Sequence, residues 1–64
     1  MDPELIKIFE GKHVKLNFKV NNFVLSGFIE KVSTSDDAFI FSTAQKTSLI
    51  RFDQIQQITE ITRG

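Results

Sequence analysis

The residues with the clearest capacity to bind a ligand are Arg51, Phe52 and Asp53, which place a cation, an aromatic ring and an anion in succession. They interrupt an apolar pattern that runs up to Ile50 and resumes at Ile55. The planar guanidinium of an arginine can stack on a nucleic-acid base and also contact phosphate. Arg51 could instead close a salt bridge or hold a turn, so its role depends on the elements that position it.

The residue types that most catalytic and metal sites need are missing or isolated in this sequence. There is no cysteine, which excludes a thiolate zinc site, and the single histidine, His13, cannot hold a metal unaided. No nucleophile sits beside a plausible base, no glycine-rich phosphate loop occurs, and the carboxylates show no paired spacing. We therefore expect neither enzymatic activity nor a metal or cofactor.

Length and charge restrict the class of protein further. The 64 residues allow one domain, 1–64, and a chain of this size buries only about 60% of the surface that its unfolded form exposes. Eight basic residues balance eight acidic ones, which argues against duplex DNA and anionic membranes, although stacking and a few cations can hold a single strand. No apolar run reaches the roughly 20 residues that cross a bilayer. The N-terminus lacks a signal segment, so we expect a cytoplasmic protein.

The first residues carry the signals of a short helix over 2–10. Asp2 suits the N-cap, Pro3 the first helical position and Gly11 the C-terminal stop. A helix of about two turns is stable only when it packs on something else.

Beyond this helix, apolar residues alternate with polar ones, which is typical of half-buried strands. Asn21 and Asn22 predict a tight hairpin turn, Gly27 a bulge or close backbone approach, and residues 53–55 a helical turn. Five strands are expected, over residues 12–20, 23–32, 38–43, 47–51 and 56–62. The predicted fold is mainly β, a short N-terminal helix followed by a five-stranded, strongly bent antiparallel small barrel over 12–62.

The middle strands carry more apolar side chains than one face of a sheet can hold. Residues 23–25, 28–29 and 38–41 are apolar at consecutive positions. One barrel needs only its inner face filled, so the surplus predicts an interface. The last two strands are expected to present an open edge, and an open edge with surplus apolar area predicts head-to-tail assembly with other copies.

Two segments make the chain resemble the Sm-like superfamily, which includes the Sm and LSm proteins and bacterial Hfq. IRFDQI, residues 50–55, resembles the second Sm motif (Ile-Arg-Gly, an acidic or polar residue, a variable residue and Ile), with Phe52 in place of the glycine. GFIEKV, residues 27–32, resembles the first motif, with Ser33 in place of its aspartate and Asp37 in place of its asparagine. The Tyr-Lys-His signature of Hfq is replaced here by Arg-Phe-Asp.

The resemblance implies an SH3-like small barrel that forms a homo-oligomeric ring of six or seven subunits, joined by the fourth and fifth strands, and binds single-stranded RNA. Arg51 would project toward the pore of that ring. Phe52 would either stack on a base or lie in the core. Asp37, Ser35 and Ser33 would either supply further RNA contacts or only form a turn.

Two functions therefore remain open. The first is a ring that binds single-stranded RNA, as an RNA chaperone or a ribonucleoprotein component. The second is a small-barrel assembly module that binds protein and little or no RNA. The Ile-Arg match favours the first function, whereas the balanced charge and the two replaced residues of the first motif favour the second.

Overall fold

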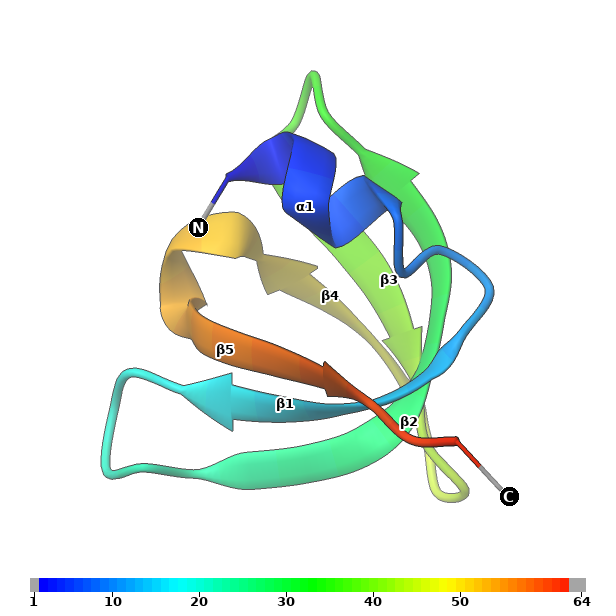
Figure 1. Ribbon diagram of the computed structural model, residues 1–64, viewed down its shortest axis with the longest axis vertical. Coiled ribbons are helices and arrows are strands. Elements are labelled where there is room, and N and C mark those ends of the chain that lie inside the picture. Colours follow the sequence, from blue (N-terminus) through cyan, green and yellow to red (C-terminus); the bar gives the residue numbers. More distant parts are fainter. Residues whose placement is uncertain (1, 63–64) are drawn as a thin grey trace.

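The computed structural model describes residues 2–62, and residues 1, 63 and 64 of the predicted domain lie outside this range. Residues 2–62 form one α-helix, five β-strands and one turn of 3₁₀ helix (Figure 1). Their bounds are α1 Pro3–Lys7, β1 His13–Phe18, β2 Val24–Ser33, β3 Ala38–Ser42, β4 Thr47–Arg51, η1 Phe52–Gln54 and β5 Ile55–Glu60. No helix in the described part of the chain is long and apolar enough to span a membrane.

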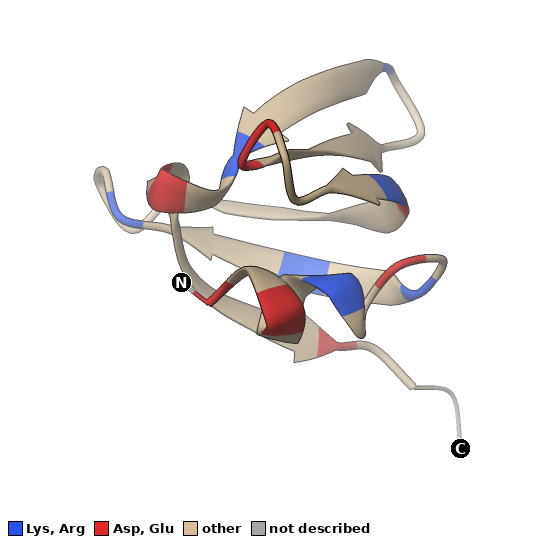
Figure 2. Ribbon diagram, turned by 90° about the horizontal axis from the view of Figure 1, so that it is seen from above, with Lys and Arg blue, Asp and Glu red and all other residues tan. Residues whose placement is uncertain are grey.

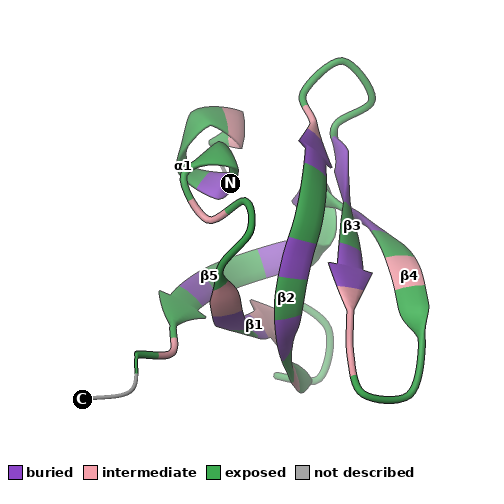
Figure 3. Ribbon diagram, turned by 90° about the vertical axis from the view of Figure 1, so that its right-hand side faces the viewer, coloured by how far each residue is buried: buried purple, intermediate pink, exposed green. Residues whose placement is uncertain are grey.

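The five strands form one antiparallel sheet in the order β4-β3-β2-β1-β5. Its two halves share β2, because residues 24–28 pair with β1 and residues 28–33 pair with β3. Figure 3 shows β1 and β5 running across the upright strands β2, β3 and β4. The predicted fold class, a short helix followed by five strongly bent antiparallel strands, is confirmed.

The interior is filled by one apolar cluster to which the helix and all five strands contribute. Phe39 lies at its centre, edge-on to Phe41 with ring centroids 6.3 Å apart and stacked on Phe52 at 6.2 Å. Ile6 is the buried residue of α1 and brings the helix onto the sheet. The cluster consists of Ile6, Val14, Leu16, Ile29, Val32, Phe39, Phe41, Ile50, Phe52, Ile55 and Ile58.

The bend in β2 depends on Gly27 and on an irregular register beside it. A side chain at Gly27 would collide with the carbonyl oxygen of Ser42 and would press on the ring of Phe41. The pairing with β3 then shifts between Ile29 and Lys31, which indicates a bulge. The predicted bulge or close approach is therefore confirmed, and both features occur.

The helix ends at Lys7 rather than at residue 10, because the residues that follow it bond to β2. The Gly11 N–H donates to the Ile29 carbonyl over 2.6 Å, and the Val32 N–H donates to Oε2 of Glu10 over 2.7 Å. At its start the helix agrees with the prediction, since Asp2 is the N-cap and accepts a hydrogen bond from the backbone N–H of Glu4.

The turns lie close to the positions that the sequence predicts. Asn21 and Asn22 have φ values of 57° and 51°, two successive left-handed residues that match the twist of a tight hairpin. The first strand ends at Phe18 rather than at residue 20, because the chain leaves the ladder to form this turn. The helical turn covers Phe52–Gln54, and β5 begins and ends slightly earlier than predicted.

Replacing Gly27 by alanine tests the close approach. Because the added methyl group would overlap backbone rather than a flexible side-chain end, we expect Gly27→Ala to lower the free energy of unfolding by about 1–3 kcal/mol. Urea denaturation measures the change, with Ser26→Ala, at an exposed neighbouring position of β2, as the control. Equal stability of the two variants would contradict the proposed packing constraint.

Candidate functional site

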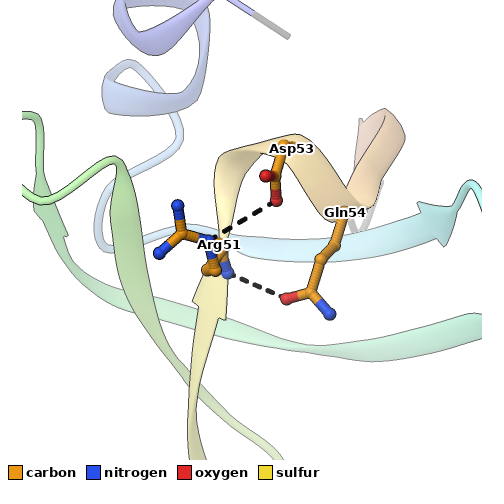
Figure 4. A network of polar contacts seen from close by, with 3 residues as sticks. All are labelled: Arg51, Asp53 and Gln54. Atoms are coloured by element: carbon orange, nitrogen blue, oxygen red, sulfur yellow. Dashed lines mark hydrogen bonds and ion pairs between the residues drawn. The ribbon is translucent and has the colours of Figure 1, made fainter.

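Arg51 is the last residue of β4 and lies where the chain enters η1. Its backbone N–H donates to Oε1 of Gln54 over 3.0 Å, and its Nε lies 3.7 Å from Oδ1 of Asp53 (Figure 4). Both members of this ion pair are more than half exposed, and exposed pairs contribute only about 0–1 kcal/mol. The guanidinium is therefore held weakly and can exchange Asp53 for a ligand.

A small open hollow surrounds Arg51, and it contains one cation and two carboxylates. Its lining residues are Pro3, Asp37, Arg51, Phe52 and Asp53, and its volume is ≈ 190 Å³. Asp37 lies beside Arg51 for two reasons. Its carbonyl accepts the Phe52 N–H over 2.8 Å, and Ala38, the residue after it and the first of β3, pairs with Arg51. The hollow is smaller than the pockets of about 300 Å³ and more that enclose small molecules. It suits one planar or charged group at the surface.

Phe52 belongs to the core, where only 4% of its surface is exposed. Its ring stacks on Phe39, with an angle of 22° between the ring planes. Of the two roles considered for Phe52, the structure therefore places it in the core, and little of its ring is left for a base. Phe52 nevertheless lines the hollow beside Arg51.

Ser33 ends β2 and Ser35 lies in the turn that follows, and the side chains of both stabilise that turn. Oγ of Ser33 donates to Oδ2 of Asp36 over 2.8 Å, and the two serine hydroxyl oxygens are 3.4 Å apart. Neither serine lines the hollow around Arg51. Of the predicted contact residues, the structure thus brings Asp37 and Phe52 to Arg51 and leaves Ser33 and Ser35 in their own hydrogen-bond network.

A second hollow, the hairpin hollow, lies beside the β1–β2 turn and is almost entirely apolar. It is lined by Phe18, Val20, Asn21, Phe23 and Gln54. The rings of Phe18 and Phe23 lie 5.7 Å apart and tilted, and Phe23 is more than half exposed. The amides of the two polar lining residues can form hydrogen bonds at its rim.

Sequence reasoning did not assign the hairpin hollow as a site, although a signal was present. Phe18, Val20 and Phe23 flank the turn at Asn21 and Asn22, where the chain reverses between β1 and β2 and brings apolar side chains close together at the end of the hairpin. Of these three residues, only Phe23 belongs to the apolar surplus of the sequence, at positions 23–25.

Large apolar side chains remain exposed on the single chain, as the surplus in the sequence predicted. Leu49 is the most exposed, at 71%, and lies on the edge strand β4 opposite Ile40 of β3. The helix adds Leu5 and Ile8. Within the described part of the chain, the exposed large hydrophobic residues are Leu5, Ile8, Val20, Phe23, Val24, Phe28, Ile40 and Leu49.

The charged residues are dispersed rather than gathered. Figure 2 shows the basic and acidic positions distributed over the helix, the strands and the turns. Within residues 2–62, no group of three or more His, Asp or Glu side chains is placed to hold a metal ion. Charge therefore differs from one hollow to the next, and no whole face of the described chain is mainly basic or mainly acidic (Figure 2).

Comparisons of the sequence with protein families, curated proteins and solved structures found no match. The resemblance to Sm-like proteins therefore stays a prediction from the two motifs.

Because Phe52 is buried and Arg51 is exposed, truncation of the two side chains should change stability by very different amounts. We expect Phe52→Ala to lower the free energy of unfolding by about 3–5 kcal/mol, because it removes a core ring. We expect Arg51→Ala to change it by less than about 1 kcal/mol, because the exposed ion pair is weak. Thermal and urea denaturation measure both values. Destabilisation by Arg51→Ala as large as that by Phe52→Ala would show that Arg51 is a structural residue.

Proposed function

We propose that copies of this chain assemble head-to-tail into a ring through strands β4 and β5, and that the assembly binds single-stranded RNA in the manner of Sm-like proteins. The observation that carries this proposal is the sheet order, which leaves β4 and β5 as edge strands within residues 2–62. An edge strand exposes unpaired backbone groups that readily accept a further strand.

The hydrogen-bond pattern of β4 supports pairing with a neighbour. The Phe52 N–H bonds inward to Asp37, and donors alternate along an antiparallel strand. The N–H groups of Leu49 and Thr47 therefore point away from β3 toward the free edge. The exposed Leu49 side chain adds apolar area at the same edge.

An antiparallel seam between β4 of one copy and β5 of the next would align the proposed contact residues of all copies at one end. In such a seam the last residue of β4, Arg51, faces the start of β5 at Ile55 in the neighbour. Because η1 joins these two points within each chain, every η1 would lie at the same end of its seam. Arg51 would then occur once per subunit around a ring. Its repetition would concentrate positive charge at one end of the seams, although each single chain is neutral.

Two further features support RNA as the ligand. Gln54 lines the hairpin hollow and also bonds to the backbone of Arg51, so this one residue connects the two hollows. The hairpin hollow offers the rings of Phe18 and Phe23 to a base, and base–aromatic stacking contributes about 1–3 kcal/mol per base. Arg51 would contact the neighbouring phosphate or base.

One observation favours the second function, an assembly module that binds protein and little or no RNA. Asp37 and Asp53 lie around the same hollow as Arg51, so each copy places two negative charges beside one positive charge. Carboxylates at this position repel phosphate, and repetition around a ring multiplies both signs of charge.

Assembly through β4 is tested by Leu49→Pro. Proline removes the outward N–H of an edge strand without breaking a bond to β3, so we expect a folded monomer. Size-exclusion chromatography with light scattering should show an oligomer for the wild type and a monomer for the variant, with circular dichroism confirming the fold. A wild-type chain that is monomeric at micromolar concentration would contradict the proposed assembly.

RNA binding is tested with labelled oligo-U and oligo-A at two salt concentrations. We expect the wild-type chain to bind at least one of them and Arg51→Ala to weaken binding by about fivefold or more, because a stacking and phosphate contact is lost. Lys46→Ala, which removes an exposed cation from the β3–β4 turn, is the matched control and should retain wild-type affinity. Absence of binding to either oligonucleotide by an assembled wild-type chain would favour the assembly module.

A further inference from the structure

A third aromatic feature lies on the outer face of the sheet, at the residue where its two halves meet. Phe28 pairs with His13 on β1 and with Ser42 on β3. The rings of His13 and Phe28 are stacked, with centroids 4.7 Å apart and an angle of 22° between their planes. Phe28 is nevertheless 47% exposed, so the imidazole covers only part of its ring.

An open hollow borders these two rings and offers hydrogen-bonding groups beside them. We call it the Phe28 hollow, and its volume is ≈ 340 Å³. Hydroxyl groups can donate or accept, so they fit the edges of different bases. The lining residues are His13, Ser26, Gly27, Phe28, Ser42, Thr43 and Ala44.

The charge around the Phe28 hollow differs from that around Arg51. No acidic residue of the described chain lines it, whereas two carboxylates line the hollow at Arg51. Lys15 is the register partner of Ser26 on the neighbouring strand, is exposed, and forms no ion pair within residues 2–62. A cation without a carboxylate partner, next to an aromatic platform, suits a phosphate attached to a stacked base.

The platform is also ordered before any ligand arrives. Phe28 is the one residue of β2 that pairs with both β1 and β3, and the imidazole of His13 packs against its ring. The adjacent Gly27 lies so close to the Ser42 carbonyl that a side chain there would collide with it. Stacking on a ring that is already fixed avoids the loss of side-chain freedom that usually opposes binding.

We propose that the Phe28 hollow binds one unpaired nucleobase, with the base on Phe28, its edge toward the hydroxyls of Ser26 and Ser42, and its phosphate toward Lys15. This inference rests on the proposed RNA binding, for which it names a second contact on the outer face of the sheet. This site is separate from the hollow at Arg51 and from the hairpin hollow, because the three hollows have no lining residue in common.

The single histidine makes a direct test feasible, because His13 gives the only imidazole signals of the chain in an NMR spectrum. Adenosine and uridine 5′-monophosphate are titrated to millimolar concentration into the full chain. A base stacked on Phe28 should shift the His13 ring protons through its ring current. In parallel, oligo-U and oligo-A binding is measured for Phe28→Leu, which keeps apolar bulk but removes the aromatic face. Val24→Ala, at an exposed position of the same strand, is the matched control.

We expect the His13 signals to move with at least one nucleotide, and Phe28→Leu to weaken oligonucleotide binding by about fivefold or more while Val24→Ala leaves it unchanged. His13 signals that stay unmoved, or wild-type binding by Phe28→Leu, would overturn the inference. If oligonucleotide binding depends on Arg51 while the His13 signals do not move, only the Phe28 site fails. If nucleotides move His13 but no oligonucleotide binds, the proposed RNA function fails and the base site remains.

Discussion

The close packing of the Gly27 backbone against the Ser42 carbonyl is the constraint on which the rest of this structure depends. It lets β2 turn from its partner β1 to its partner β3 within one strand. The bend encloses Phe39 and Phe41 on the inner face and gives a very short chain a core that α1 covers through Ile6. Without this approach, five short strands would form a flatter sheet with much less buried apolar area.

The same bend determines what stays exposed. The sheet curves, yet β4 and β5 each keep a free side within the described residues, and η1 joins their ends. Gln54 in η1 bonds to the backbone of Arg51 and borders the hairpin hollow. The segment that connects the two edge strands therefore also lies beside both proposed ligand-binding groups, Arg51 and the hairpin hollow. The proposed assembly and the proposed ligand binding would therefore depend on one another, because η1 joins the two edge strands and its Gln54 bonds to the backbone of Arg51.

The sequence predicted the fold better than it predicted the site. The alternation of apolar residues, Asn21-Asn22 and Gly27 have local physical causes, so strands, turn and bend could be predicted from residue types. The length of the helix could not, because it depends on bonds from residues 10 and 11 to a strand far along the chain. The sequence pattern also could not decide whether Phe52 lies in the core or contacts a ligand, because its burial depends on stacking with Phe39 of another strand. The stack of His13 on Phe28 was equally unpredictable, because it brings together residues of two different strands.

The central claim is that the free edge of β4 is covered by another copy of the chain in solution. Amide hydrogen exchange at Leu49 tests it most directly, because this N–H points away from β3 and has no ladder partner within one chain. The account predicts that at micromolar concentration the Leu49 amide exchanges about as slowly as that of Ile50, which bonds inward. Rapid exchange at Leu49 beside a protected Ile50 would contradict it, since the edge would then face water and the chain would stand alone.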